Sequence, residues 1–247
     1  MIARSPSFFG AVAPISARIL AHPVRMDHST ARAQPTMFGY EKPYSEACEE
    51  NKRPILGVIR PLFQTAQRLL EIGSGTGQHA VYFAAALPHL TWQTSDRASY
   101  LPGIRAWIDE ADLSNLPPPL LLDVRARWPD ERYDAIFSAN TAHIMSEPEV
   151  VALFDGVGRL LEPGGHFALY GPFDIAGRHT SESNARFDAM LRARDPAMGL
   201  RDRDWLTELG RERGLAFVAD HPMPVNNRTL VWRREGDLAR HSDRETA

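Results

Sequence analysis

Apolar residues along this chain follow two alternating patterns, short continuous runs and longer segments in which apolar positions recur at helical spacing. The short runs predict strands at residues 68–72, 90–95, 120–123, 133–139 and 166–170. The helical spacing predicts helices at residues 53–63, 78–87, 100–111, 147–161 and 201–213. Two late runs, 215–219 and 229–233, predict an antiparallel hairpin at one edge. The alternation predicts a single α/β domain with a seven-stranded, mostly parallel sheet and helices on both faces.

The most informative segment is Leu69–Gly77, which reads as a buried strand, an acidic residue and a turn with three glycines. Glycines let the backbone approach a ligand closely, and a strand that feeds a helix through such a turn forms a nucleotide-sized crevice. The spacing is G-x-G-x-G, whereas dinucleotide-binding proteins carry G-x-G-x-x-G. Glu71 would repel a pyrophosphate but attract an ammonium and a sulfonium. The segment therefore predicts S-adenosylmethionine (SAM) as the ligand, with an ordinary strand-to-helix turn as the alternative.

Polar residues at the ends of the next strands extend this hypothesis. Asp96 ends the second strand, where a carboxylate can accept both ribose hydroxyls. Asp123 ends the third strand, where it can accept the adenine amino group while the Val124 N–H donates to a ring nitrogen. Both aspartates also suit turns or helix caps, which is the alternative at each position.

Asn140 closes the fourth strand, where the methyl-bearing sulfur is expected, and it can bond the cofactor or orient a nucleophile. His143 can accept a proton from that nucleophile, or it can be a packed structural histidine. The segment 140–143 lacks the Asn-Pro-Pro-aromatic signature of enzymes that methylate exocyclic base amines, which disfavours a nucleobase acceptor. Further candidates for an acceptor pocket are Asn51, Tyr170, Phe173 and Asn227, of which the two aromatic residues fit the core equally well.

Residues 173–200 form an insertion before the last predicted helix. It contains a candidate mobile lid at residues 177–181 and a short predicted helix at 184–194. The arginines from Arg178 to Arg203 are interleaved with acidic residues, which predicts a solvated surface of ion pairs.

Composition narrows the possible functions. The 247 residues carry a net charge of −3, which gives no general electrostatic reason to bind nucleic acid or an anionic membrane. Cys48 is the single cysteine, so we expect a reducing, cytoplasmic environment, and no metal-ligand spacing is present. No apolar run is long enough to span a membrane. The glycine turn lacks the ending of a phosphate-binding P-loop, and Ser74 does not stand in a nucleophile elbow.

The chain divides by composition into an extension at 1–36, a ligand-binding domain at 37–234 and a polar tail at 235–247. The extension carries arginines and a single acidic residue. This composition suits a disordered tail, a start assigned too early or an organelle-targeting segment, and a short apolar stretch leaves a secretory signal as a further alternative.

With these residues assembled, the chain resembles class I SAM-dependent methyltransferases over about residues 54–234, and more narrowly the family that includes methyltransferase-like protein 26. The runs that carry the resemblance are residues 50–56, 70–80, 87–90, 92–93, 139–144, 170–173, 183–185, 192–196 and 223–227. The resemblance implies a Rossmann-like fold. The family commonly has an arginine where this chain has Glu50, which puts an anion-binding role for that segment in doubt.

The resemblance also implies roles for the site residues. The turn formed by Glu71, Gly73, Ser74, Gly75 and Gly77 would hold the methionine moiety of SAM. Asp96 would bind the ribose, and Asp123 with Val124 the adenine. We therefore predict transfer of a methyl group to a small molecule, with a catalytically silent SAM-binding regulatory or scaffold protein as the alternative. The sequence leaves the acceptor and the oligomeric state open.

Overall fold

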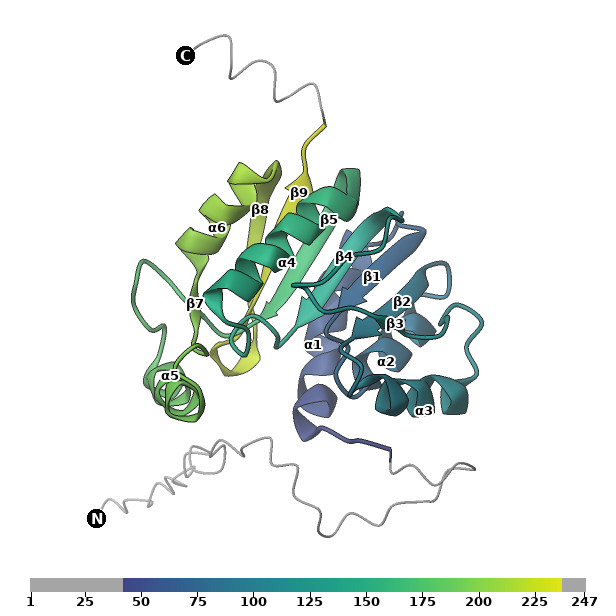
Figure 1. The fold of residues 1–247 in the computed structure, drawn as a ribbon, viewed down its shortest axis with the longest axis horizontal. Coiled ribbons are helices and arrows are strands. Elements are labelled where there is room, and N and C mark those ends of the chain that lie inside the picture. Colours follow the sequence, from purple (N-terminus) through teal and green to yellow (C-terminus); the bar gives the residue numbers. More distant parts are fainter. Residues whose placement is uncertain (1–41, 237–247) are drawn as a thin grey trace, which may run out of the picture. The chain divides into compact units, whose positions relative to one another are not determined.

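The computed structural model of this chain describes residues 42–236 (Figure 1). The predicted extension at 1–36 and all but two residues of the predicted tail lie outside the described residues. The helices are α1 (Glu46–Leu62), α2 (Gln78–Ala86), α3 (Leu101–Ala111), α4 (Glu147–Leu160), α5 (Glu182–Arg194), α6 (Arg203–Glu212) and the 3-10 turn η1 (Pro224–Asn226). The strands are β1 (Arg68–Ile72), β2 (Thr91–Asp96), β3 (Leu120–Leu121), β4 (Tyr133–Ala139), β5 (Leu161–Gly171), β6 (Phe173–Asp174), β7 (Arg201–Asp202), β8 (Leu215–Pro222) and β9 (Arg228–Arg234).

Seven of these strands form one sheet in the order β3-β2-β1-β4-β5-β9-β8. Strands β1 to β5 pair in parallel, and β9 lies between β5 and β8, antiparallel to both. The predicted sheet and its late antiparallel pair are therefore confirmed. The last strand is not at the edge, however, because β8 occupies that position. The carboxyl ends of β1, β2 and β4 lie along one edge of the sheet, and the turns that follow them build the candidate site.

Helices cover the sheet on both faces, and each face has its own hydrophobic cluster (Figure 1). One cluster joins α4 and α6 to the sheet and contains Phe154, Phe167 and Trp232. The other joins α1, α2 and α3 to the opposite face and contains Phe83 and Trp92. Central strands therefore bury both faces, which explains their nearly continuous apolar sequences.

Several boundaries differ from the prediction for local reasons. Helix α1 begins at Glu46, ahead of the predicted start at Arg53-Pro54, because side-chain contacts with α2 hold its first two turns. Strand β3 stops at Leu121 because Asp123 begins a turn, in which it accepts hydrogen bonds from the backbone of Arg125 and Ala126. Helix α4 begins at the predicted residue, and a capping box formed by Ser146 and Glu149 holds its first turn.

Among residues 42–236, no helix combines the length and apolar character needed to cross a membrane. The compartment in which the protein works stays a prediction.

Two helical glycines give a matched test of packing. A Cβ at Gly156 in α4 would overlap the ring of Trp128, whereas a Cβ at Gly57 in α1 would meet nothing within 4 Å. We expect Gly156→Ala to lower the free energy of unfolding by about 1–3 kcal/mol through overpacking. Gly57→Ala should raise it by about 0.5–1 kcal/mol because alanine loses less backbone entropy on folding. Urea denaturation measures both, and a Gly156→Ala variant as stable as wild type would contradict the packing.

Candidate functional site

The three glycines of the β1–α2 turn all have left-handed backbone conformations, but each for a different reason. Gly73 has φ 74°, and a Cβ there would lie 2.5 Å from the Thr141 methyl carbon. Gly77 has φ 93°, and a Cβ there would lie 3.1 Å from Ile104 Cα in α3. Gly75 has φ 58°, and a Cβ there would meet nothing within 4 Å. Two glycines therefore serve close packing, whereas the backbone of Gly75 faces open space that a ligand can enter.

Glu71 lies beneath this turn, in β1, with only 2% of its surface exposed. Its Oε2 accepts hydrogen bonds from Ser74 Oγ at 2.9 Å and from Trp92 Nε1 at 3.0 Å. Burial raises the pKa of Glu71 to about 7, although the bonds from Trp92 and Ser74 oppose the shift. The Glu71 carboxylate therefore stabilises the turn through its hydrogen bond to Ser74. Its predicted contact with a cofactor stays a prediction.

Backbone hydrogen bonds tie the same turn to the end of β2. The N–H groups of Gly73 and Ser74 both donate to the Ser95 carbonyl at 3.0 Å. The Ser95 N–H donates to Ser74 Oγ at 3.1 Å, and Ser95 Oγ donates to the Glu71 carbonyl at 2.6 Å. The shape of the turn is thus fixed before any ligand binds.

Asp96 extends this connection toward the open space. Its Oδ2 accepts from the Gly75 N–H at 2.8 Å and its Oδ1 from the Arg97 N–H at 2.7 Å. Burial raises the pKa of Asp96, whereas these two backbone bonds lower it. Each carboxylate oxygen has more than one acceptor site, so both can still accept from a ligand. Asp96 therefore lies beside the one glycine that faces open space.

Asp123 and Val124 follow β3 and have turn contacts of their own. Asp123 Oδ1 accepts from the Arg125 N–H at 2.9 Å, and the Val124 carbonyl accepts from Trp128 Nε1 at 2.9 Å. The bond of Asp123 is the one expected if this residue serves to form a turn, which was the alternative to an adenine contact. A contact with adenine stays a prediction for both residues.

Asn140 ends β4 in the left-handed region, at φ 58°. Its N–H donates to the Tyr170 carbonyl at 2.9 Å, and the following Thr141 hydroxyl lies 2.6 Å from Ser138 Oγ. Asparagine adopts this conformation more readily than most non-glycine residues do. Within residues 42–236, no side-chain hydrogen bond holds the Asn140 amide. An asparagine with a free amide thus stands where the sequence predicted one end of the ligand.

His143 is only 7% exposed, and its ring packs edge-on against Phe187 with the ring centres 5.2 Å apart. Burial and the nearby Arg201 lower the pKa of His143 to about 4, so the ring is neutral at physiological pH. No residue in the described part of the chain hydrogen-bonds to this ring. His143 is therefore packed against its neighbours, as one hypothesis predicted, and its ring also stays available for a hydrogen bond.

Arg201 corrects the prediction that the arginines from Arg178 to Arg203 form a solvated surface. It is 3% exposed, and its guanidinium donates to the carbonyls of Ala142 at 3.3 Å, Ala197 at 2.7 Å and Met145. The burial could not be predicted from the charge pattern, because all three acceptors are backbone carbonyls and two of them, Ala142 and Met145, are distant in the chain. Arg201 holds the loop that carries His143.

Three of the predicted acceptor residues meet near the hydroxyl of Tyr170, where the side chains of Asn51 and Asn227 oppose the effect of burial on its pKa. Burial raises the pKa of Tyr170 to about 12, so the hydroxyl is neutral. Asn51 also bonds to His79, with Oδ1 2.6 Å from Nε2. We call Asn51, His79, Tyr170 and Asn227 the Tyr170 cluster. Phe173 takes the core alternative, since it is buried in the cluster of α4 and α6.

Gln78 is a site residue that the sequence analysis missed. Its Oε1 accepts from the Ser45 N–H at 2.6 Å and from Thr76 Oγ1 at 3.1 Å, and its Nε2 donates to Glu49 Oε1 at 3.1 Å. It thus joins α1 to the glycine turn. A polar residue at a buried position of an otherwise apolar helix was the available signal.

The predicted lid has specific contacts with the rest of the insertion. The Gly177 N–H donates to Asp202 Oδ2 at 2.7 Å, and His179 Nδ1 lies 2.9 Å from Asp174 Oδ1. The mobility of this segment stays a prediction.

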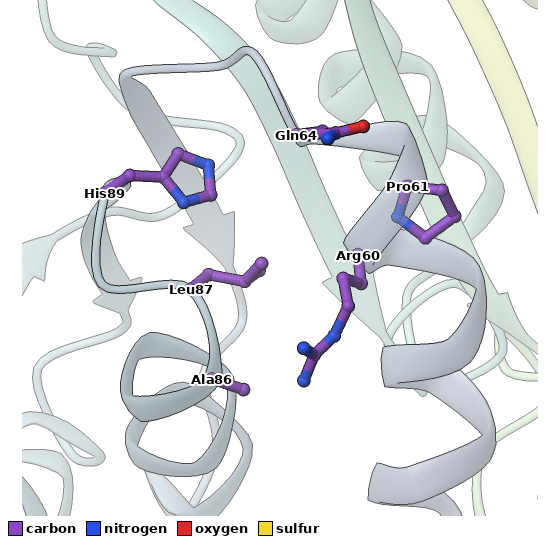
Figure 2. Close-up of a pocket in the computed structure, with 6 residues that line it drawn as sticks. All are labelled: Arg60, Pro61, Gln64, Ala86, Leu87 and His89. Carbon is purple, nitrogen blue, oxygen red and sulfur yellow. The ribbon is translucent and has the colours of Figure 1, made fainter.

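A surface hollow of about 360 Å³ lies at the far ends of α1 and α2 (Figure 2). It is lined by Arg60, Pro61, Gln64, Ala86, Leu87 and His89. These residues belong to the end of the molecule where β1 begins, whereas the glycine turn follows the end of β1. The hollow therefore contains none of the predicted site residues.

Comparison with known proteins shows one matching family and several solved structures with a similar fold. Residues 42–234 match the family described as "Protein of unknown function (DUF938)". An O-methyltransferase family protein from Burkholderia thailandensis has a TM-score of 0.67 at 18% identity, over 78% of this chain and 58% of that one. The S-adenosylmethionine-dependent methyltransferase SibL has a TM-score of 0.66 at 21% identity, over 77% and 56% of the two chains. Human N-acetylserotonin methyltransferase, solved with SAM, has a TM-score of 0.63 at 14% identity, over 77% and 53%.

This chain thus spans a little over half the length of these three proteins. At such identities the likeness concerns the fold, and the predicted Rossmann-like class I methyltransferase fold is confirmed.

A double-mutant cycle tests the close packing of Gly73. Gly73→Ala should lower the free energy of unfolding by about 2–4 kcal/mol through backbone strain and overlap with the Thr141 methyl group. Thr141→Ser removes that methyl group and keeps the hydroxyl contact with Ser138, so Gly73→Ala should be less destabilising in this background. Gly75→Ala is the control, since it adds the backbone strain without the overlap. Denaturant titrations that give additive free energies for the first pair would contradict the contact.

Proposed function

This chain belongs to the protein family described as DUF938, and we propose that it binds SAM and transfers the methyl group of SAM to a small-molecule acceptor. The observation that carries the proposal is the open backbone face at Gly75, with the Asp96 carboxylate hydrogen-bonded to that same residue. The likeness of the fold to SAM-dependent methyltransferases supports it. The narrower kinship with methyltransferase-like protein 26 belongs to the same proposal.

The cofactor would lie along the carboxyl edge of the sheet. Its methionine part would contact the turn from Glu71 to Gly77, and its ribose hydroxyls would donate to the remaining acceptor sites of Asp96. The adenine would lie over the end of β3, against Asp123 and Val124. This placement uses the residues that the sequence analysis selected, and Gly75 accounts for the close approach of the backbone.

When bound, SAM supplies a methyl group on a positively charged sulfur, an already activated carbon. The protein then has to align the acceptor with that carbon and exclude water. Asn140 and His143 lie next to the expected position of the sulfur and have side chains available for this alignment. Arg201 keeps their loop in place through the backbone carbonyls of Ala142 and Met145.

Calorimetric titration tests the cofactor. Wild-type protein should bind SAM more tightly than NAD. Asp96→Ala should weaken SAM binding at least tenfold, because two charge-assisted hydrogen bonds contribute on the order of 3 kcal/mol. Asp109→Ala, which changes an exposed aspartate of α3, is the control and should leave the affinity unchanged. Tight binding of NAD without binding of SAM would overturn the proposal.

Turnover separates an enzyme from a silent SAM-binding protein. Wild-type protein mixed with SAM and a metabolite extract should form S-adenosylhomocysteine faster than the Asp96→Ala variant does. If SAM binds but the two rates are equal with every extract fraction, the alternative of a regulatory or scaffold protein holds.

The raised pKa of Glu71 gives a separate test of its proposed role. A ligand ammonium near this carboxylate favours its charged form and lowers its pKa from about 7. At pH 6.5 an α-amino group, with a pKa of about 7.7–8.0, is already protonated, so binding should release a fraction of a proton from Glu71. Calorimetry in two buffers of different ionisation enthalpy measures that release, which should vanish in Glu71→Gln. Binding of SAM without proton release would contradict the Glu71 contact and leave the cofactor proposal standing.

A further inference from the structure

The free polar groups of the candidate site lie at the ends of β4 and β5. The Asn140 amide and the His143 ring have no hydrogen-bond partner among residues 42–236, although His143 is more than nine-tenths buried. A Cβ placed on Gly171, the residue after Tyr170, would lie 3.8 Å from His143 Nδ1. The ring nitrogens of His143 are not among the fully buried atoms without a partner, so this imidazole is open to a hydrogen bond with a polar group of a ligand.

The ionisable groups that the structure places around these two residues are either neutral or paired. His143 and Tyr170 are both neutral at physiological pH. The cations that adjoin the Tyr170 cluster in the chain are paired, Lys52 with Glu49 and Arg228 with Asp220 at 2.5 Å. Arg201, whose charge helps to lower the pKa of His143, donates to backbone carbonyls and lies 3.7 Å from Glu147. An anionic acceptor would therefore find no unpaired cation among these groups, and its desolvation would be poorly compensated.

Apolar side chains border the same region. Phe187 of α5 contacts the His143 ring, and the neighbouring Ile144 is exposed. Helix α5 is joined to the turn before β9, since Asn184 Nδ2 donates to the Asn226 carbonyl at 3.2 Å. In that turn Val225, which is 56% exposed, adopts φ 59°, a conformation that β-branched residues rarely take. Strained backbone conformations of this kind occur often at ligand-binding positions. The exposed Val225 side chain is therefore a candidate contact for the apolar part of a ligand.

We propose that the methyl acceptor is an uncharged phenol-type small molecule whose hydroxyl group hydrogen-bonds to Asn140 and His143. The inference rests on the proposed function and deepens it. The apolar ring of the acceptor would lie against Phe187, Ile144 and Val225. The neutral Tyr170 cluster would form the side of the site toward α1.

The chemistry of the step follows from these contacts. The acceptor oxygen forms a bond to the methyl carbon while the carbon–sulfur bond breaks, and the electron pair of that bond stays on sulfur, which leaves S-adenosylhomocysteine. As the oxygen–carbon bond forms, the hydroxyl group gains positive charge and becomes strongly acidic, and its proton passes to the free ring nitrogen of His143 and then to water. A weakly basic imidazole serves a hydroxyl whose own pKa is near 10, as in tyrosine, better than it serves an aliphatic alcohol.

Three probes of one size but different charge test the acceptor class. Phenol, benzoate and benzylammonium are each added to the full chain saturated with S-adenosylhomocysteine at pH 7.5, and saturation-transfer NMR reports their binding. We expect transfer to phenol at least fivefold stronger than to benzoate. His143→Phe should reduce the phenol signal at least threefold, whereas His89→Phe, which changes a histidine of the surface hollow, should leave it unchanged.

A change of preference gives a second readout that does not depend on a loss of binding. Asn140→Asp should make benzylammonium the preferred probe, because aspartate tolerates the left-handed backbone and adds a negative charge where the hydroxyl would lie. Gln64→Glu makes the same amide-to-acid change in the surface hollow and should not alter the preference.

The outcomes separate this inference from the proposed function. Preference for benzoate, no transfer to phenol, or a phenol signal unaffected by both His143→Phe and Asn140→Asp would overturn the acceptor class while binding of S-adenosylhomocysteine stands. If calorimetry detects no binding of S-adenosylhomocysteine or SAM to the wild-type chain, the proposed function itself fails. Variants are compared only where their affinity for S-adenosylhomocysteine matches that of wild type.

Discussion

The structure of the candidate site depends on one constraint, that the backbone between β1 and α2 must turn through three left-handed positions within five residues. The turn stays in this form because the buried Glu71 carboxylate and the Ser95 backbone hold it from two sides. Its neighbours adapt to it. The Thr141 methyl group fills the space above Gly73, and α3 packs directly against Gly77. The positions of the loop after β4 and of α3 therefore follow from the same turn.

The sequence predicted the parts of this arrangement that depend on local pattern. The glycine spacing, the acidic residues at strand ends and the alternation of strands and helices were read from periodicity and turn chemistry, and the sheet confirms the alternation. Asp96 ends β2 as predicted, whereas Asp123 lies in the turn after β3. The sequence also selected Asn51, Tyr170 and Asn227, although nothing local indicated that they meet near one hydroxyl.

The contacts that the sequence could not predict join residues far apart in the chain. Arg201 binds carbonyls more than fifty positions away, and its burial contradicts the charge pattern around it. Gln78 links the turn to α1, which begins earlier than its proline suggests. The position of β9 inside the sheet depends on pairing with both β5 and β8. Each of these is a tertiary contact that overrides a local preference.

Charge divides the carboxyl edge of the sheet into two halves that suit the two proposed reactants. Around the glycine turn the carboxyl groups of Glu71 and Asp96 have raised pKa values because they are buried, and Arg97 follows Asp96. Near Asn140, His143 has a lowered pKa and Tyr170 a raised one, so both are neutral, and Arg201 lies 3.7 Å from Glu147. A cationic methyl donor gains from the first half, and an uncharged acceptor avoids a desolvation penalty in the second. Since one product of the proposed transfer is an uncharged thioether, the attraction between donor and carboxylates weakens once the methyl group has moved. Because of this loss of charge, the site would hold S-adenosylhomocysteine less tightly than SAM, which would favour release of the product.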